Sequence, residues 1–473
     1  MSTFLSRFPG CCNCRVGAPI QAATAPCRMR FFPSPPLAKA MNEQPLELVM
    51  SEKAFAGLVS AQAVPFHRVA LALVRRRDAW TRPQFFQLIS QADALEALLD
   101  DHGARHNRTF SYLRELVASL RGLALAGFSL SHLERRLDGY PTNLSDAERG
   151  QAVSAARQSR VFLERALLRL LETTLQEERA QGIEVAGEPG DLESVAAPGP
   201  KQILPRNMGQ LDLDSDEQKT AEVASRFLQA SALFDDLGTR RIEDPDEREV
   251  WLQRFCTEER ARVFEATVHN LQSAYDTWVK GTSIEANDVR LAMLRGHASA
   301  ALHLLEAVTH LTHFVERHES GMRNEESERR IEALVPRSAV QEITLNNLLV
   351  WASTFMRRGR PLAEDLLPSY TDVQELEVEL HDELYLHARP CALIVGIINR
   401  YATPVEMLVE GRRCNAASIL DLMVTIGSHP DARRFVFRGD VNPLRDIRLL
   451  FQSGLGENGA ELPEQLSYLR PGG

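Results

Sequence analysis

The amino-acid sequence predicts a mostly helical protein that ends in a small α+β domain. Three observations carry this prediction. Apolar residues recur at spacings of three and four over residues 50–181 and again over 215–368, as they do on one face of an amphipathic helix. A stretch rich in Gly and Pro, residues 182–214, forms a linker or loop between the two helical regions. After residue 372 the spacing changes to alternation, which is typical of a half-buried strand.

The length and composition indicate a globular chain of several domains. At roughly 100–200 residues per domain, 473 residues suggest about two to four of them. Apolar residues make up 44% of the chain, and no run approaches the ~18 uninterrupted apolar residues of a membrane helix. The net charge of −10 argues against a basic phosphate-binding surface. We therefore expect no nucleic-acid partner and no membrane span.

The first forty residues differ from the rest. They hold five cations, no Asp or Glu, and four of the seven cysteines, so the other 433 residues carry −15. Adjacent Cys11 and Cys12 fit poorly the two separated ligand pairs of a zinc site, and no apolar run of ~7–15 residues provides a secretory signal. We expect residues 1–45 to be a disordered leader, or to precede a true start at Met41 or Met50. The three other cysteines indicate a reducing, cytoplasmic location.

The first helical region, residues 50–181, is expected to form a bundle. Its last helix begins at a capping box, in which Ser145 is followed three residues later by Glu148. From there to Gln181 the sequence predicts one long helix with a single apolar stripe. Such a stripe must be buried against partner helices, so a bundle follows.

The second helical region, residues 215–368, repeats this pattern. A second capping box begins at Ser215. Gly281 is expected to break the chain into an antiparallel helical hairpin, and Gly359 and Pro361 to end the last helix. Helices are predicted over residues 216–236, 245–280, 284–318 and 338–358.

One face of the helix predicted over 284–318 carries titratable side chains. Glu306 and His310 stand at i and i+4, a spacing that suits one half of a metal site, with His303 beside them. The matching ligand pair from a second helix is not evident, and a solvated polar face explains the pattern better. We predict no metal and no cofactor. Nothing else in the helical regions indicates chemistry, and self-association through the helices is left open.

Residues 372–457 are predicted to fold in the order β-α-β-β-α-β-α. The alternating stretches bounded by turn residues are strands, and three short apolar stretches are helices. This order predicts a four-stranded antiparallel sheet covered by helices on one face. A disordered tail is expected over 458–473. Strands are predicted over residues 373–380, 404–410, 412–415 and 433–438, and helices ending at residues 401, 426 and 451.

Two motifs in this region closely resemble HPr, the histidine phosphocarrier of the bacterial phosphoenolpyruvate-dependent phosphotransferase system. The first is His-Ala-Arg-Pro at residues 387–390, and the second is Asn-Ala-Ala-Ser-Ile-Leu at residues 415–420. The resemblance covers 372–457 and implies an open-faced β-sandwich. It also implies that His387 accepts a phosphoryl group beside Arg389. It further implies regulatory phosphorylation of Ser418 and partner docking through an apolar patch of Ile419, Leu420 and Met423.

The chemistry of these residues suits this function independently of the family. A neutral imidazole at His387 is a competent nucleophile near pH 7. The residue stands just before a predicted helix, whose first free N–H groups favour an anion. Arg389 adds a planar fork of donors for phosphate oxygens. Pro390 falls in the first turn, where its missing N–H breaks no helical hydrogen bond.

Three residues depart from the family pattern. Tyr385 stands where the family usually has Gly, two residues before the histidine, and an aromatic ring there changes the loop or shields the site. Cys391 replaces a small residue, which is a mild change. Asp421 replaces a Gly three residues after Ser418, and its carboxylate disfavours a second anion. This weakens the case for phosphorylation of Ser418.

The expected function is therefore that of a phosphocarrier or phosphotransferase-type regulator. His387 would take a phosphoryl group from an enzyme I-like donor and pass it to a downstream acceptor protein, while the helical region modulates or localises the transfer. The alternative is an HPr-derived interaction or scaffold module that carries no phosphate.

Overall fold

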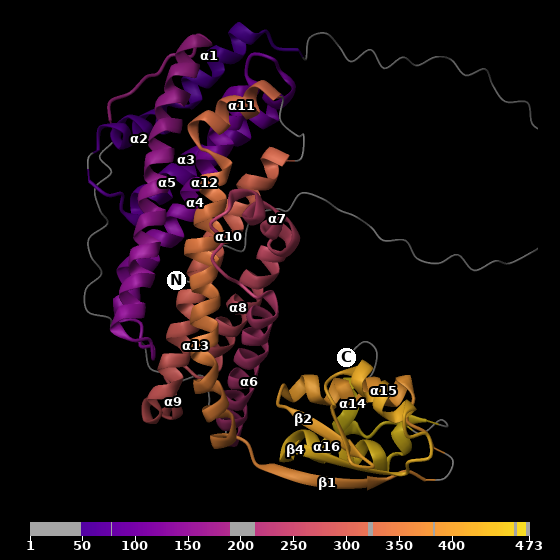
Figure 1. Ribbon diagram of the computed structural model, residues 1–473. Coiled ribbons are helices and arrows are strands. Elements are labelled where there is room, and N and C mark those ends of the chain that lie inside the picture. The colour runs from indigo at the N-terminus through magenta and orange to yellow at the C-terminus, as the bar shows by residue number, and fades with distance from the viewer. Residues whose placement is uncertain are drawn as a thin grey trace, which may run out of the picture. The chain divides into compact units, whose positions relative to one another are not determined.

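The computed structural model describes residues 49–76, 78–189, 213–319, 325–381, 384–457 and 461–469. The segment 1–45 and most of the linker over 182–214 lie outside these residues. Within the described residues the chain is helical as far as residue 369, and a four-stranded sheet with three helices follows (Figure 1). This confirms the predicted fold class.

The described residues of the first helical region contain five α-helices. The longest, α5, begins at the predicted capping box. The Ser145 hydroxyl accepts a hydrogen bond from the Glu148 amide at 3.3 Å, and the Glu148 carboxylate accepts one from the Ser145 amide at 3.0 Å. Two amides of the first turn are thereby satisfied. The helices are α1 (Glu52–Gln62), α2 (Val64–Arg75), α3 (Arg82–Asp101), α4 (Ser111–Arg136) and α5 (Asp146–Ala180).

The second helical region differs from its prediction at several places, three of which concern where predicted helices begin, break or end. Helix α6 begins at Leu213, so the Ser215 capping box does not mark its start. The stretch over 245–280 is two helices, because the Thr257 hydroxyl caps a new helix by accepting from the amide three residues on. The helices are α6 (Leu213–Leu237), α7 (Pro245–Phe255), α8 (Glu258–Trp278), α9 (Ser283–Asn287), α10 (Val289–Glu319), α11 (Glu325–Leu334), α12 (Arg337–Glu342) and α13 (Val350–Leu366), with a π-helix, Ile343–Leu349, before α13.

The third difference is that α13 passes through Gly359 and Pro361 instead of ending there. Gly359 lies against Phe227 of α6, and a Cβ on this glycine would stand 2.4 Å from the ring. The glycine therefore permits a close helix contact and is no stop signal. Gly281 does break the chain as predicted, with a left-handed φ of 74°.

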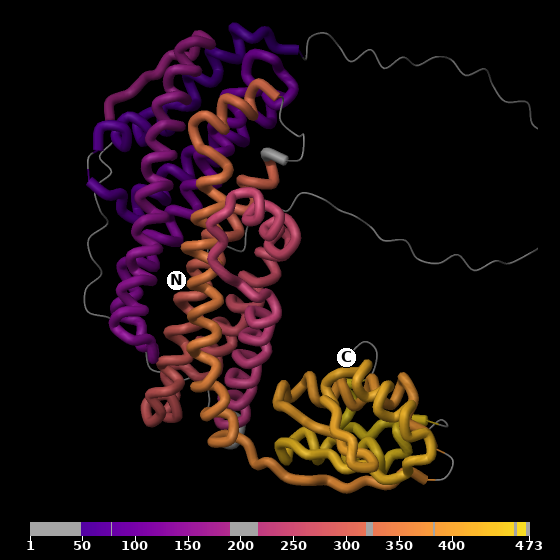
Figure 2. The backbone as a smooth tube through the Cα atoms, in the orientation of Figure 1, coloured from indigo at the N-terminus to yellow at the C-terminus, as the bar shows by residue number. Residues whose placement is uncertain are grey.

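One continuous core joins the two helical regions. A single cluster of buried apolar side chains extends from Phe55 to Leu366. Helix α10 packs against α4, α8 and α13, and α4 also packs against α3 and α5. Figure 2 traces this path of the backbone, in which segments of both regions run alongside one another. The two regions thus bury their apolar stripes against each other.

The segment Ser111–Gly139, which contains α4, is long and apolar enough to cross a membrane by length and composition. The bent pair of α1 and α2 passes the same test only when it is counted as one broken span. In Ser111–Gly139, 72% of the most apolar window is buried within the protein. Its apolar side chains therefore belong to the helical core.

The C-terminal domain has the predicted order of elements, and its antiparallel strands lie in the sheet order β1-β4-β2-β3. Alternate strand residues point to one face, where Leu376, Met407 and Phe437 are buried beneath the helices. A second apolar core thereby forms between sheet and helices. The elements are β1 (Val373–Glu379), α14 (Ala388–Tyr401), β2 (Val405–Val409), β3 (Arg412–Asn415), α15 (Ile419–Gly427), β4 (Arg434–Asp440) and α16 (Val441–Gln452).

Residues 461–469 also pack on this domain. Sequence alone predicts disorder over 458–473, but residues Glu464–Leu469 form a 3-10 helix with Leu466 fully buried. The Tyr468 hydroxyl donates to Asp446 of α16 at 2.7 Å, and the Arg400 guanidinium lies 4.1 Å from the Tyr468 ring centre. A cation–π contact and a charge-assisted hydrogen bond therefore hold this segment against α14 and α16.

Candidate functional site

His387 is the N-cap residue of α14. Its backbone is extended, and its carbonyl accepts the first helical hydrogen bond, from the Cys391 amide at 3.1 Å. Its side chain makes no capping bond and is 53% exposed. Leu384 and Leu386 on the preceding segment are buried, so they anchor the loop that carries the histidine. The imidazole is thus held at a helix start and is accessible to a partner.

The first turn of α14 supplies donors beside this imidazole. The amides of Ala388 and Arg389 occupy the first two helical positions, where an amide has no partner inside the helix. Pro390 follows in the same turn and is buried. The guanidinium of Arg389 is 67% exposed. These groups and the positive end of the helix dipole favour an anion near His387, by about 0.3–1 kcal/mol for the dipole alone.

Glu457 is a member of this site that sequence reasoning missed. One of its carboxylate oxygens lies 3.7 Å from the His387 Nε2 atom, and the other lies 3.7 Å from the Arg389 Nε atom. The carboxylate is mostly buried, at 21% exposure. Glu457 lies seventy residues after the histidine, directly after the chain turns back from α16 through Gly454–Gly456. No local motif links these positions, so only the tertiary fold brings them together.

The ring of Tyr385 is partly exposed and contacts an arginine. Its ring is 57% exposed, and the Arg433 guanidinium stands 4.6 Å from its centre. The same guanidinium donates to the Leu384 carbonyl at 2.7 Å. Arg433 therefore fixes the conformation of the loop before His387. Cys391, the second departure, is fully buried in the domain core, and burial raises the pKa of its thiol to about 11.

Ser418 is the N-cap of α15. Its hydroxyl accepts a hydrogen bond from the Asp421 amide at 3.2 Å, and its own amide donates to the Asn415 carbonyl. The hydroxyl thus has a structural part in starting the helix. Asp421 lies in the first turn of the same helix and is exposed. A phosphate on Ser418 would gain from the helix dipole and lose from this carboxylate.

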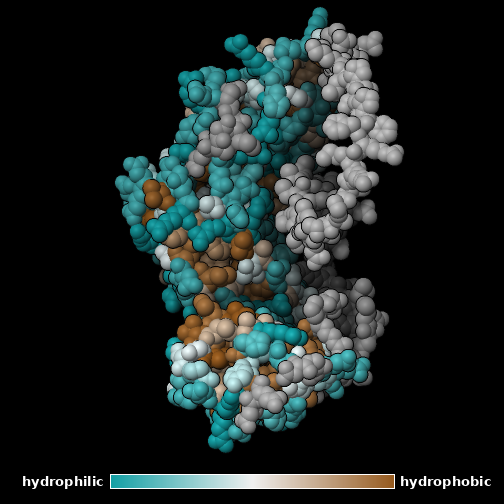
Figure 3. Space-filling model, turned by 90° about the vertical axis from the view of Figure 1, so that its right-hand side faces the viewer, coloured by the Kyte–Doolittle hydropathy of each residue, from teal (hydrophilic) through white to brown (hydrophobic). Residues whose placement is uncertain are grey.

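The three apolar residues predicted for docking are all exposed on α15. Ile419, Leu420 and Met423 have exposures of 44%, 69% and 38%, while Leu422 takes the core position of the helix. Val424 extends the patch at 50% exposure, and sequence reasoning did not include it. Figure 3 shows one face of the molecule, on which apolar side chains of the C-terminal domain reach the surface.

The histidine-rich face of α10 is partly buried, whereas the sequence predicts a solvated polar face. The ring of His303 meets that of His132 of α4 edge to face, with ring centres 4.4 Å apart, and His303 bonds to Glu306 at 3.0 Å. His313 bonds to Glu258 of α8 at 2.7 Å. The face is partly covered because α10 packs against α4 and α8. Within the described ranges, no three side chains of the metal-ligand type converge.

The comparisons with known proteins bear on the C-terminal domain. Residues 374–429 match the family model described as the PTS HPr component phosphorylation site. The matched segment runs from β1 to the end of α15 and includes both sequence motifs. No curated protein and no solved structure matches the chain. The family match, the order of elements and the antiparallel sheet together identify the C-terminal region as an HPr-like domain.

Proposed function

We propose that this protein is a phosphocarrier of the phosphotransferase type, in which His387 receives a phosphoryl group from an enzyme I-like donor and passes it to an acceptor protein. The observation that carries the proposal is the position of the exposed His387 imidazole at the start of α14, beside two unbonded first-turn amides and Arg389. The fold alone would not support it, since an HPr-like sheet can present other surfaces.

The contact with Glu457 suggests which nitrogen reacts. A carboxylate 3.7 Å from Nε2 favours the tautomer that carries its proton there, and Nδ1 then has the free lone pair. In the transfer a P–N bond to Nδ1 of His387 forms while the P–N bond of the donor phosphohistidine breaks. No proton needs to leave, because the attacking nitrogen is already unprotonated. The reverse of this step hands the group to the acceptor.

The positive groups of the site would hold the phosphoryl oxygens. The first-turn amides donate hydrogen bonds, and Arg389 offers a charge-assisted pair. Arg389 must leave its 3.7 Å contact with Glu457 to reach a phosphate. At 67% exposure its side chain is free to turn, and a surface ion pair of this kind contributes only about 0–1 kcal/mol. Replacing Glu457 by a phosphate as the partner of Arg389 therefore costs little free energy.

The test is phosphotransfer from purified enzyme I with radiolabelled phosphoenolpyruvate. We expect the wild type and His381→Ala to be labelled and His387→Ala to remain unlabelled. His381 is a fair control because it is an exposed histidine of the same domain. The label must also be acid-labile, as a phosphoramidate is. Absence of label with several enzyme I preparations, or equal label in His387→Ala, would contradict the proposal.

A specific observation also supports a second candidate function, that of an interaction module without phosphate transfer. Tyr385, two residues before His387, is held by Arg433 and is 57% exposed, so it presents an aromatic surface next to the histidine in the sequence. In this case the α15 patch binds partners and the helical region acts as a scaffold. A pull-down with wild type and His387→Ala separates the two. If partner binding depends on phosphorylation, the scaffold function is excluded. If the same partners bind with and without phosphorylation and also bind His387→Ala, the scaffold function is favoured.

A further inference from the structure

A cavity of about 210 Å³ lies between α4, α8 and α10 in the helical region. Three arginines and two histidines line it: Arg121 of α4, Arg262 of α8, and His310, His313 and Arg317 of α10. Among the described residues that line it none is acidic. The remaining wall is made of small and apolar residues, including Gly122, at which an added Cβ would meet nothing within 4 Å. The cavity is therefore cationic and has free space on the α4 side.

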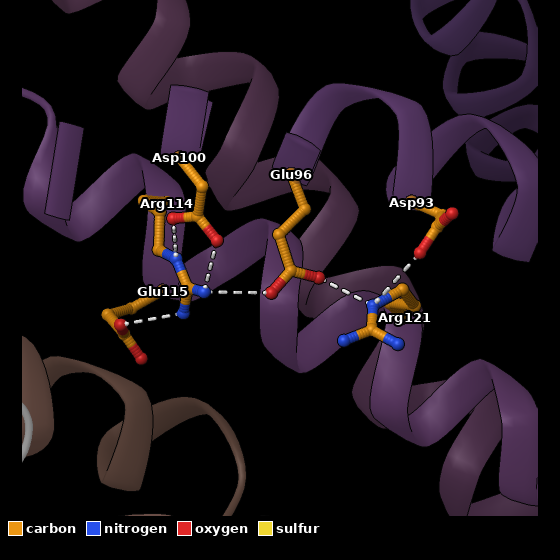
Figure 4. A network of polar contacts seen from close by, with 6 residues as sticks. All are labelled: Asp93, Glu96, Asp100, Arg114, Glu115 and Arg121. Atoms are coloured by element: carbon orange, nitrogen blue, oxygen red, sulfur yellow. Dashed lines mark hydrogen bonds and ion pairs between the residues drawn. The ribbon is translucent and has the colours of Figure 1, made fainter. Parts of the chain in front are cut away.

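Carboxylates outside the lining hold these cations in place. Glu96 and Asp93 both contact Arg121 through its Nε atom, and Figure 4 shows the two terminal nitrogens of Arg121 directed away from them. On the other side, Glu258 bonds to Arg262 at 2.6 Å and to His313 at 2.7 Å. The side chains are thus fixed before any ligand arrives, and such pre-organisation lowers the entropic cost of binding.

The pKa shifts in the cavity come first from burial. Burial lowers the pKa of His310 to about 4, Glu306 opposes this shift, and the charges of Arg262, His313 and Arg121 add to it. Burial likewise lowers the pKa of Arg317, with a further contribution from Arg114 and opposing effects of Glu115 and Glu96. His310 is therefore neutral near pH 7, and the positive charge of the lining comes from its arginines.

We propose that this cavity binds a small phosphate-bearing anion, either inorganic phosphate or a phosphate ester. The guanidinium fork matches phosphate oxygens in pairs, and arginines from three helices line this one cavity. A metal cation is excluded by the sign of the lining charge. A bound anion would join α4, α8 and α10, so it would stabilise the region that connects the two helical halves.

The experiment is calorimetric titration of the full-length, unphosphorylated protein with inorganic phosphate, and separately with glycerol 3-phosphate. No phosphoryl donor is present, so no group is transferred to His387, and the Arg262→Gln variant described below separates this cavity from the anion-binding groups beside that histidine. We expect one saturable site per chain for at least one of the two anions, whereas glycerol does not bind. If glycerol 3-phosphate binds more tightly than inorganic phosphate, the natural ligand is an organic phosphate. If inorganic phosphate binds more tightly, the natural ligand is free phosphate.

Two kinds of variant locate the site. Arg262→Gln should weaken binding by about tenfold or more, because it removes one charged donor. Its control is Arg240→Gln, which alters a similar exposed ion pair, with Glu247, away from the cavity. Gly122→Leu should abolish binding by filling the cavity, and Gly57→Leu, at an open glycine of α1, should not. Absence of binding to the wild type, or equal binding in Arg262→Gln, overturns the proposal even if Gly122→Leu fails to fold.

Discussion

Neutralising Glu457 should increase the fraction of protein that carries phosphate on His387. Its carboxylate lies 3.7 Å from the His387 Nε2 atom and competes with the phosphoryl group for Arg389. A phosphoryl group brings roughly −1.5 to −2 charges to the histidine, so Glu457 repels the phosphorylated state. In Glu457→Gln the shape and the hydrogen-bond acceptor remain while the charge is lost.

The magnitude follows from the distance. Two unit charges 3.7 Å apart interact by about 1.1 kcal/mol at the dielectric constant of water, which is a lower bound because the Glu457 side chain is only 21% exposed. The phosphate oxygens lie farther from Glu457 than the ring nitrogen but carry more charge. We therefore expect Glu457→Gln to favour phosphorylation by about 1–2 kcal/mol, or roughly 5–30-fold in the equilibrium constant.

The assay is the equilibrium between phosphorylated protein and enzyme I at fixed ratios of phosphoenolpyruvate to pyruvate. Glu464→Gln is the matched control, because it removes the same charge from an exposed position of the C-terminal segment. The difference between wild type and Glu457→Gln should shrink as salt is raised, since screening weakens exposed charges. An unchanged or lower phosphorylated fraction in Glu457→Gln would refute this reasoning.

Three further predictions concern stability, each measured by urea or thermal unfolding. Burial lowers the pKa of His297 to about 4. Below pH ~6.5 only the unfolded state then binds its proton, so stability falls towards pH 4 by up to about 1.4 kcal/mol per unit, and His297→Gln flattens that slope. Gly127→Ala should cost about 1–3 kcal/mol, because its Cβ would stand 2.3 Å from the Phe85 ring. In Gly122→Ala the added Cβ meets no atom within 4 Å, so the free energy of unfolding should instead rise by about 0.5–1 kcal/mol. Ser418→Ala should cost about 1 kcal/mol by removing the cap of α15, and Ser418→Asp should cost less.

Most of the C-terminal domain could be predicted because its signals are local. The alternation of β1, the turn at Gly411 and the caps of the short helices all lie within a few residues of the element they define. The position of His387 at a helix start follows from the same short-range pattern. The helical regions were less predictable at their breaks, because tertiary contacts carried α13 through Gly359 and Pro361.

The sequence by itself determined the class of fold, the order of the C-terminal elements and the placement of His387 and Arg389 at the start of a helix. Each depends on residues that are close along the chain, where side-chain spacing and capping act directly. Only the tertiary structure decided that Glu457 faces that pair and that the two helical regions share one core. It alone also brought Arg121, Arg262 and Arg317 around one cavity. These contacts join residues tens to hundreds of positions apart, and no local periodicity specifies which helix face meets which.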